Sequence, residues 1–118
     1  MRTVKFKDID FYIGQNANEN WELLDNSKKI NDNYVWFHLN SFASPYVIMY
    51  ETIDELRKKY DITEINELLY FGGELCKENS KYKYLKPIKI LYTTLNKLTK
   101  TEKVGEVTIS GKKNLLSI

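Results

Sequence analysis

The residues able to do nucleophilic, acid–base or metal chemistry are few. His38 is the only histidine and Cys76 the only cysteine among 118 residues. A zinc site would have to join them to carboxylates at spacings that match no structural or catalytic pattern, so we expect no metal ion. A nucleophilic Cys76–His38 pair is the alternative. It is disfavoured because Cys76 falls on the apolar stripe of an expected helix, where cysteine is usually an inert small hydrophobe.

Two further kinds of catalytic motif have simpler explanations. Gly72–Gly73 lies inside a helical pattern and lacks the Lys-Ser/Thr pair that a phosphate-binding loop requires. The acidic pairs at Asp54–Glu55 and at Glu64 and Glu67 fall on the outward sides of expected helices, where solvation explains them. The sequence therefore predicts a protein that is not an enzyme and needs no cofactor.

A combination of aromatic rings and lysines remains. A period of two along one expected strand places Tyr34, Trp36 and His38 on the same face, and Tyr46 and Tyr50 share a face of its neighbour. Bases stack on such rings at about 1–3 kcal/mol each and phosphates need cations, so the pattern favours single-stranded nucleic acid. The alternative is that helices cover both sheet faces and bury these rings.

Charge is divided unevenly along the chain, although the formal net charge is only +2. Up to Cys76 there are 8 basic and 13 acidic residues (net −5), and after it there are 10 basic and 3 acidic residues (net +7). A basic stretch of this size suggests an anionic partner, although a solvated lysine-rich face has the same composition. The lysines of this stretch that could meet phosphates are Lys81, Lys83, Lys86, Lys89, Lys97, Lys100 and Lys103.

Apolar periodicity indicates the elements that must position these residues. Strands are expected over 3–6, 11–15, 34–39, 46–50 and from Pro87 through Tyr92, with a closing hairpin of 104–109 and 114–118. Helices are expected over 19–25, 53–60 and 64–79, with N-caps at Asn18, Thr52 and Thr63, while 26–33 is a polar loop and Leu95–Lys100 a basic turn. The fold class is α+β: a single domain over residues 1–118, with a largely antiparallel sheet, one main helix and one or two short helices.

The two adjacent glycines of the main helix need an explanation of their own. Glycine inside a helix costs about 1 kcal/mol relative to alanine. Close approach of the helix to a strand is the expected compensation, and a kink is the competing explanation.

The composition also indicates the cellular compartment of the protein. A single cysteine cannot form an internal disulfide, and the N-terminus has no apolar segment of signal-peptide length. No apolar stretch approaches the length of a membrane span. We therefore expect a cytoplasmic protein with no membrane contact.

Two stretches go beyond these generic patterns. The run GQNANENWEL over 14–23 matches the form G-x-N-x-x-x-N-x-x-L, and VWFHL over 35–39 is close to D-x-W-F-H. Further matches follow at 44–47, in the small residues of the main helix, at 90–93, at Lys100 and at 104–107. Together they resemble the NFACT-R domain family, also labelled DUF814, over about residues 11–110. The short form looks most like the coiled-coil domain-containing protein 25 branch.

The resemblance implies a non-enzymatic RNA-binding module of the kind found in larger proteins that bind tRNA and stalled large ribosomal subunits during ribosome-associated quality control. The branch has also been linked to DNA binding. The implied partners are tRNA or ribosomal RNA, with DNA and the ribosome or its proteins as further possibilities. A protein-interaction module that docks on ribosomal or assembly partners is the alternative function.

Matching positions and nearby lysines give the candidate nucleic-acid-binding residues. They are Asn16, Asn20, Trp36, His38, Tyr46, Lys97, Lys100 and Lys103. The asparagines could instead satisfy backbone groups at the first strand-to-helix turn, and we favour structural roles for Gly14 and Asn16. The chain departs from the family pattern where Asp32 stands three places before Val35 and where Tyr46 replaces a second histidine.

Overall fold

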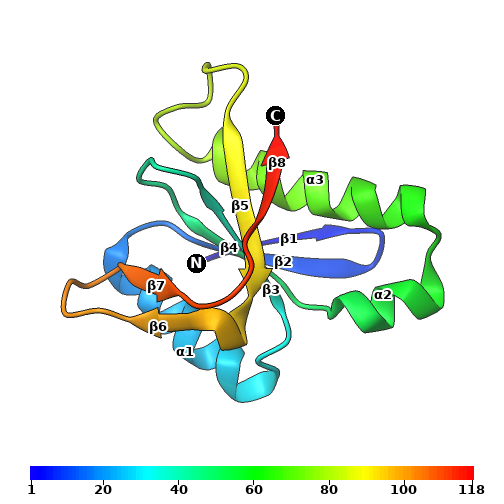
Figure 1. The fold of residues 1–118 in the computed structure, drawn as a ribbon, viewed down its shortest axis with the longest axis horizontal. Coiled ribbons are helices and arrows are strands. Elements are labelled where there is room, and N and C mark those ends of the chain that lie inside the picture. Colours follow the sequence, from blue (N-terminus) through cyan, green and yellow to red (C-terminus); the bar gives the residue numbers. More distant parts are fainter.

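An antiparallel sheet organises the chain, and the computed structural model describes residues 1–118 (Figure 1). Its strands are β1 (Arg2–Phe6), β2 (Ile9–Gly14), β3 (Val35–Leu39), β4 (Tyr46–Met49), β5 (Lys89–Thr94) and β8 (Asn114–Ser117). They follow the order β1-β2-β4-β3-β5-β8, and each neighbouring pair is antiparallel. The α+β class with a largely antiparallel sheet is confirmed.

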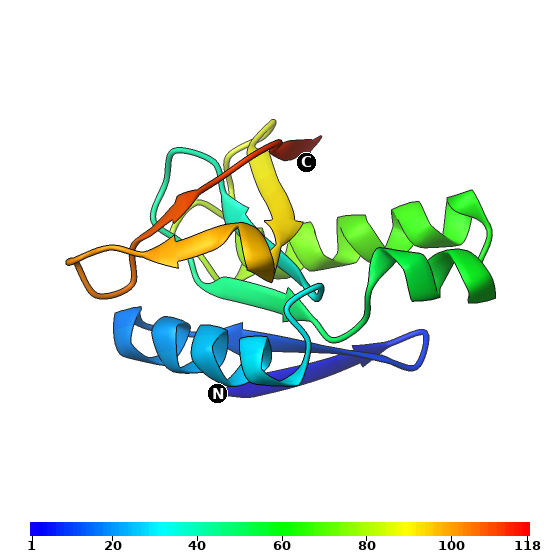
Figure 2. The same ribbon diagram turned by 60° about the horizontal axis from the view of Figure 1, so that its bottom comes forward.

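Helices cover both faces of this sheet. One face packs against α3 (Ile62–Glu78), which follows the short α2 (Ile53–Lys59), and the other against α1 (Ala17–Ile30). A two-stranded ribbon of β6 (Leu98–Lys100) and β7 (Val107–Ile109) follows the single-turn η1 (Leu95–Lys97) and lies beside α1 (Figure 2). None of the helices combines the length and the apolar composition that a membrane span requires.

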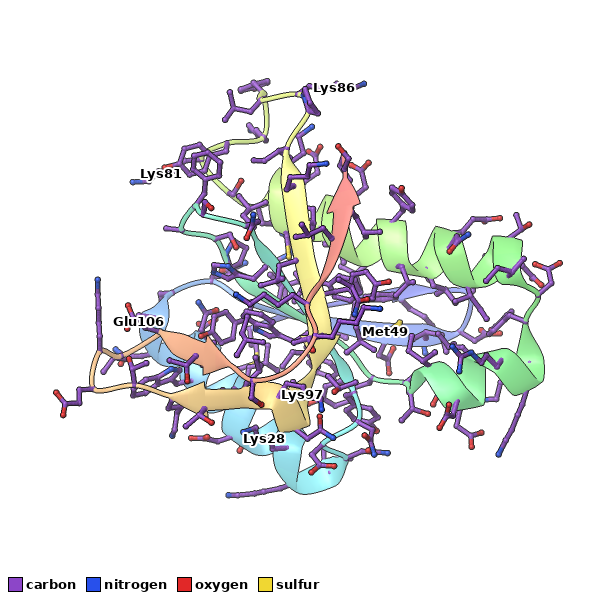
Figure 3. The ribbon with its side chains drawn as sticks, in the orientation of Figure 1. Lys28, Met49, Lys81, Lys86, Lys97 and Glu106 are labelled. Atoms are coloured by element: carbon purple, nitrogen blue, oxygen red, sulfur yellow. The ribbon has the colours of Figure 1, made fainter.

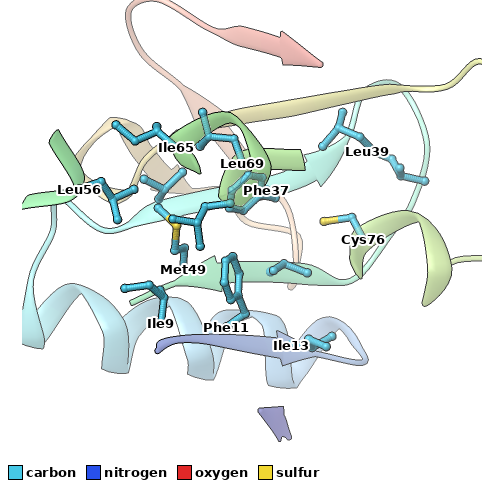
Figure 4. Close-up of a cluster of buried hydrophobic side chains, with 14 of the residues drawn as sticks. Ile9, Phe11, Ile13, Phe37, Leu39, Met49, Leu56, Ile65, Leu69 and Cys76 are labelled. Atoms are coloured by element: carbon cyan, nitrogen blue, oxygen red, sulfur yellow. The ribbon is translucent and has the colours of Figure 1, made fainter. Parts of the chain in front are cut away.

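Alternation along the strands divides the core into two parts. Val35, Phe37 and Leu39 of β3 point toward α3 and join the larger cluster, which Figure 4 shows with Ile65 and Cys76 of that helix. Residues of the opposite parity enter a smaller cluster with α1 and the ribbon; it consists of Leu23, Leu24, Trp36, Tyr46, Ile48, Leu91, Leu95 and Leu98. The period of two expected over 34–39 is confirmed, and each sheet face has a buried cluster of its own.

Helix α1 is longer than the sequence predicted. Its N-cap is Asn16, not Asn18: the Asn16 Oδ1 accepts a hydrogen bond of 2.9 Å from the Glu19 N–H. It continues beyond residue 25 to Ile30, so the expected polar loop over 26–33 is wrong in its first part. Tertiary bonds stabilise the added turn, because Ser27 shares a 2.6 Å hydrogen bond with Tyr50 and Lys28 Nζ donates to the Leu98 carbonyl at 2.6 Å.

The other two helices lie close to their expected positions. Thr52 caps α2 as predicted, since its Oγ1 accepts from the Glu55 N–H at 3.1 Å. Helix α3 starts earlier than expected, because Asp61 and not Thr63 is its N-cap. Asp61 Oδ1 accepts from the Glu64 N–H at 2.9 Å, and the Glu64 carboxylate accepts from the Asp61 N–H at 3.2 Å. This reciprocal pair satisfies two of the helix's free N–H groups.

The adjacent glycines of α3 lie where the helix approaches the sheet most closely. A Cβ on Gly72 would stand 2.5 Å from the Phe37 ring, and one on Gly73 would stand 2.7 Å from the Ile118 side chain. The helix runs without interruption through both residues. Close approach is therefore the explanation, as predicted.

The end of the chain pairs differently from expectation. Strand β7 pairs with β6, and β8 pairs with β5, so 104–109 and 114–118 do not form a hairpin with each other. The expected basic turn Leu95–Lys100 instead contains η1 and β6, because Leu95 and Leu98 are buried against α1. Strand β5 begins at Lys89, two residues after Pro87.

Candidate functional site

An open groove with a volume of about 680 Å³ lies at one end of the sheet. Four segments form it: the start of α1, the β3–β4 connection, the chain just after α3, and the β6–β7 turn. The predicted site residues that line it are Asn16, Asn20, Trp36, His38, Tyr46 and Lys103. Fold and sequence thus bring most of the predicted site together, from three separate parts of the chain.

Lys97 and Lys100 do not line the groove. Lys100 Nζ makes a 2.8 Å ion pair with Asp25 and lies 5.0 Å from the centre of the Trp21 ring. Lys97 is exposed at the other end of the ribbon from Glu106, which does line the groove (Figure 3). Of the three predicted lysines, the structure therefore places only Lys103 in the same groove as His38.

His38 contributes a hydrogen-bond acceptor to the groove. Its Nδ1 lies 2.7 Å from the carbonyl oxygen of Leu39, and because a carbonyl only accepts, Nδ1 carries the proton. The Nε2 atom has no partner within the protein. Burial lowers the pKa of His38, and the hydrogen bond to Leu39 opposes this only in part. The imidazole is therefore neutral at pH 7, with Nε2 free to accept.

Trp36 and Tyr46 support His38 instead of offering open rings. The Trp36 and His38 rings are stacked 5.3 Å apart at 9°, and the edge of Tyr46 meets both. Trp36 is only 2% exposed and Tyr46 only 1%. The alternative in which helices bury the rings is thus confirmed for these two residues. Neither presents a face on which a base could stack.

Tyr46 also connects the sheet to the rim of the groove. Its hydroxyl donates to the Gly105 carbonyl at 2.6 Å, and its backbone N–H donates to Asn20 Oδ1 at 3.0 Å. Burial raises the pKa of Tyr46 to about 12, so the phenol stays protonated and remains a donor at neutral pH. By contrast, the Trp36 indole N–H is buried and has no hydrogen-bond partner.

The asparagines of the site have structural partners. Asn16 uses its side-chain oxygen as the α1 N-cap, and Asn20 uses its own to hold the start of β4. A Cβ on Gly14 would stand 2.5 Å from the Asn20 oxygen, so glycine allows the helix to approach β2. These contacts agree with structural roles for Gly14 and Asn16 and add one for Asn20.

Lys81 lines the groove but was not among the predicted site residues. It follows α3, and the next residue, Tyr82, packs its ring 4.5 Å from that of Phe42 in the β3–β4 connection. In the sequence, the only sign that Lys81 could bind a ligand is its place in the basic stretch after Cys76. That stretch does not distinguish Lys81 from the other lysines, because only the folded chain brings this loop beside residues 40–45.

The Cys76–His38 pair is not formed. Cys76 is fully buried in the larger core under α3, whereas His38 stacks on Trp36 of the opposite face. Burial also raises the pKa of the Cys76 thiol well above its ordinary value, which disfavours a thiolate. No group of three or more His, Cys, Asp or Glu side chains comes together in a way that could hold a metal ion.

Comparison with known proteins gives matches of two kinds, to a family model and to solved structures. A family model described as the NFACT protein RNA binding domain matches residues 3–115. The C-terminal part of the fibronectin/fibrinogen-binding protein from Streptococcus suis has a similar fold, with a TM-score of 0.74 and 21% sequence identity. That match covers 93% of the present chain but only 40% of the Streptococcus suis chain. No curated protein matches.

Proposed function

Because the chain belongs to the family of NFACT protein RNA binding domains, which indicates a nucleic-acid-binding role, we propose that its ligand is RNA. The RNA is tRNA or ribosomal RNA, bound without catalysis in the cytoplasm during ribosome-associated quality control. The similarity of the short chain to the coiled-coil domain-containing protein 25 branch remains part of this proposal, as does the absence of any membrane contact.

The observation that carries the proposal is a groove with free cations on opposite rims. Lys103 stands in the β6–β7 turn and Lys81 after α3, and neither makes an ion pair with the protein. Glu106 is the one acidic residue that lines the groove, and its carboxylate accepts a 3.0 Å hydrogen bond from Thr101. Unpaired lysines provide the phosphate contacts that dominate nucleic-acid affinity.

Between these cations the groove offers polar groups to a nucleotide. His38 Nε2 can accept a hydrogen bond from a base N–H or a 2′-hydroxyl. The side-chain nitrogens of Asn16 and Asn20 donate to no protein atom, because only their oxygens are used structurally. Trp36 and Tyr46 act through His38, whose ring they hold in place.

The test is a fluorescence anisotropy titration of the chain with labelled tRNA and labelled oligouridine over a series of salt concentrations. Lys103→Gln should weaken binding and lower the slope of log K against log salt by about 0.7–0.9, the value for one lost phosphate contact. Lys100→Gln is the matched control, because the Lys100 ammonium is already paired with the Asp25 carboxylate. It should have a smaller effect on both affinity and slope.

Other outcomes would contradict the proposal. Undetectable or salt-independent binding at low salt would exclude an RNA-binding role of this kind. Equal competition by DNA of the same sequence would show that the 2′-hydroxyl is not recognised. Capture of ribosomal proteins that survives both nuclease treatment and Lys103→Glu would favour the docking alternative.

A further inference from the structure

We propose that the connection between α3 and β5, residues 80–87, is a second contact for the same RNA strand, in which Tyr84 stacks on an unpaired base. This inference rests on the proposed function and adds a site outside the groove floor. The flanking phosphates would be held by the lysines of the connection, which are Lys81, Lys83 and Lys86.

Tyr84 has no role in the fold that would explain an aromatic residue there. It is 87% exposed, more than any other large hydrophobic residue of the chain, and its hydroxyl makes no hydrogen bond within the protein. Its contact with the Lys83 ammonium, 5.3 Å from the ring centre, leaves the rest of the ring open. Single exposed rings are common on protein surfaces, so exposure alone decides nothing. Two features around the ring, its charge and its position, indicate that it binds a base.

The first feature is the positive charge of the 80–87 connection. No acidic residue occurs between Glu78 and Glu102, and none of the lysines in the 80–87 connection makes an ion pair. Lysines of the first part of the chain behave differently, because most of them are paired with carboxylates, as Lys5 is with Asp10 at 3.0 Å. The positive charge of the connection is therefore available to a phosphate chain, and a base adjacent to those phosphates would lie within reach of the ring.

The second feature is the position of the connection relative to the groove. The connection begins inside the groove, which residues 79–82 line, and then rises beyond the sheet, with the labelled Lys81 and Lys86 pointing outward (Figure 3). Its base is fixed: Ser80 Oγ donates to the Lys77 carbonyl at 2.7 Å and accepts from the Tyr82 N–H at 3.1 Å. A strand leaving the groove past Lys81 would next meet the tip that presents Tyr84.

The chemistry defines the class of ligand. Stacking on a tyrosine needs a base that is free on at least one face, as in single strands, loops and ends, and it tolerates any base. The connection should therefore favour unpaired RNA over duplex RNA and show little sequence preference.

The experiment uses the full chain with labelled oligouridine and with a blunt RNA duplex. Tyr84→Ala should weaken oligouridine binding about 5-fold or more, the range for loss of one stacked base, and should change duplex binding little. Tyr84→Phe keeps the ring and should bind like the unaltered chain. Tyr70→Ala, which removes another exposed tyrosine from the outer side of α3, is the matched control.

The lysines are tested by charge-matched double variants. Lys83→Gln with Lys86→Gln should lower the salt slope on oligouridine by about 0.7 for each lost contact. Lys112→Gln with Lys113→Gln removes the same charge from another unpaired pair and should not lower it as much. Circular dichroism melting of each variant confirms that the fold is kept.

The outcomes separate this inference from the proposed function. If Lys103→Gln weakens RNA binding while the Tyr84 and Lys83/Lys86 variants bind normally, the groove binds RNA and the second contact is wrong. If the unaltered chain binds no RNA, both fail. Binding of the connection to anionic phospholipid vesicles, with no effect of its variants on RNA, would also overturn the inference.

Discussion

His38 is better suited to accept a hydrogen bond than to carry a charge. Its Nδ1–H is committed to the Leu39 carbonyl, and the Trp36 ring stacked on it removes water from one face. A histidine chosen from the sequence for its position among rings thus becomes, in the structure, a neutral group with one free nitrogen. Sequence alone could not distinguish these states, because they depend on burial.

This neutral state predicts a pH dependence of stability. Because burial lowers the folded-state pKa of His38, the unfolded chain binds more protons as pH falls below about 6.5, the ordinary histidine value. The contribution of His38 to stability is therefore full at neutral pH and declines on acidification. Urea titrations at pH 7.5 and pH 5 should show a larger loss for the unaltered chain than for His38→Gln. An equal loss in both would contradict the assignment.

Gly72 allows a second prediction at the residue scale. An alanine there would gain about 1 kcal/mol of helix propensity but would place its Cβ against the Phe37 ring. Overpacking a core costs about 1–3 kcal/mol, so Gly72→Ala should lower the free energy of unfolding measured in urea. Glu74→Ala, on the exposed side of the same helix, is the control and should change it little. A stabilised Gly72→Ala would mean that α3 can move away from the sheet.

At the scale of elements, the sequence predicted types and approximate positions well. Strands and helices come from local periodicity, and α3 carries the strongest apolar stripe of the chain. The end of α1 was missed because Ser27 and Lys28 are stabilised by Tyr50 and Leu98, which are distant in sequence. The pairing of β6 with β7 was missed for a similar reason, since nothing local tells a strand which neighbour it will meet.

The N-terminus of α3 allows a prediction that distinguishes between two candidate N-cap residues. Asp61 is the observed cap, and Thr63 is the one expected from sequence. Asp61→Ala should lower the free energy of unfolding by about 0.5–2 kcal/mol, because it removes the acceptor for the Glu64 N–H. Thr63→Ala should be close to neutral in the same urea titration. The reverse order would place the start of the helix two residues later.

At the scale of the whole molecule, the charge division is partly neutralised by folding. The first part of the chain pairs most of its cations internally, whereas Lys100 is the only basic residue after Cys76 that makes an ion pair. The unpaired cations are therefore concentrated in the late loops and strands. Composition predicted this surplus of positive charge, but only the folded chain shows that Lys81 and Lys103 line the same groove.

The contacts among Gly14, Asn20 and Tyr46 bear on how related domains come to bind different nucleic acids. Gly14 makes room for the Asn20 side chain, and Asn20 in turn fixes the start of β4. The glycine and the two asparagine oxygens of the G-x-N-x-x-x-N run therefore build the scaffold, and ligand choice depends mainly on the surrounding loops. Two domains could share this run and still prefer different nucleic acids, provided that their loop lysines and rings differ.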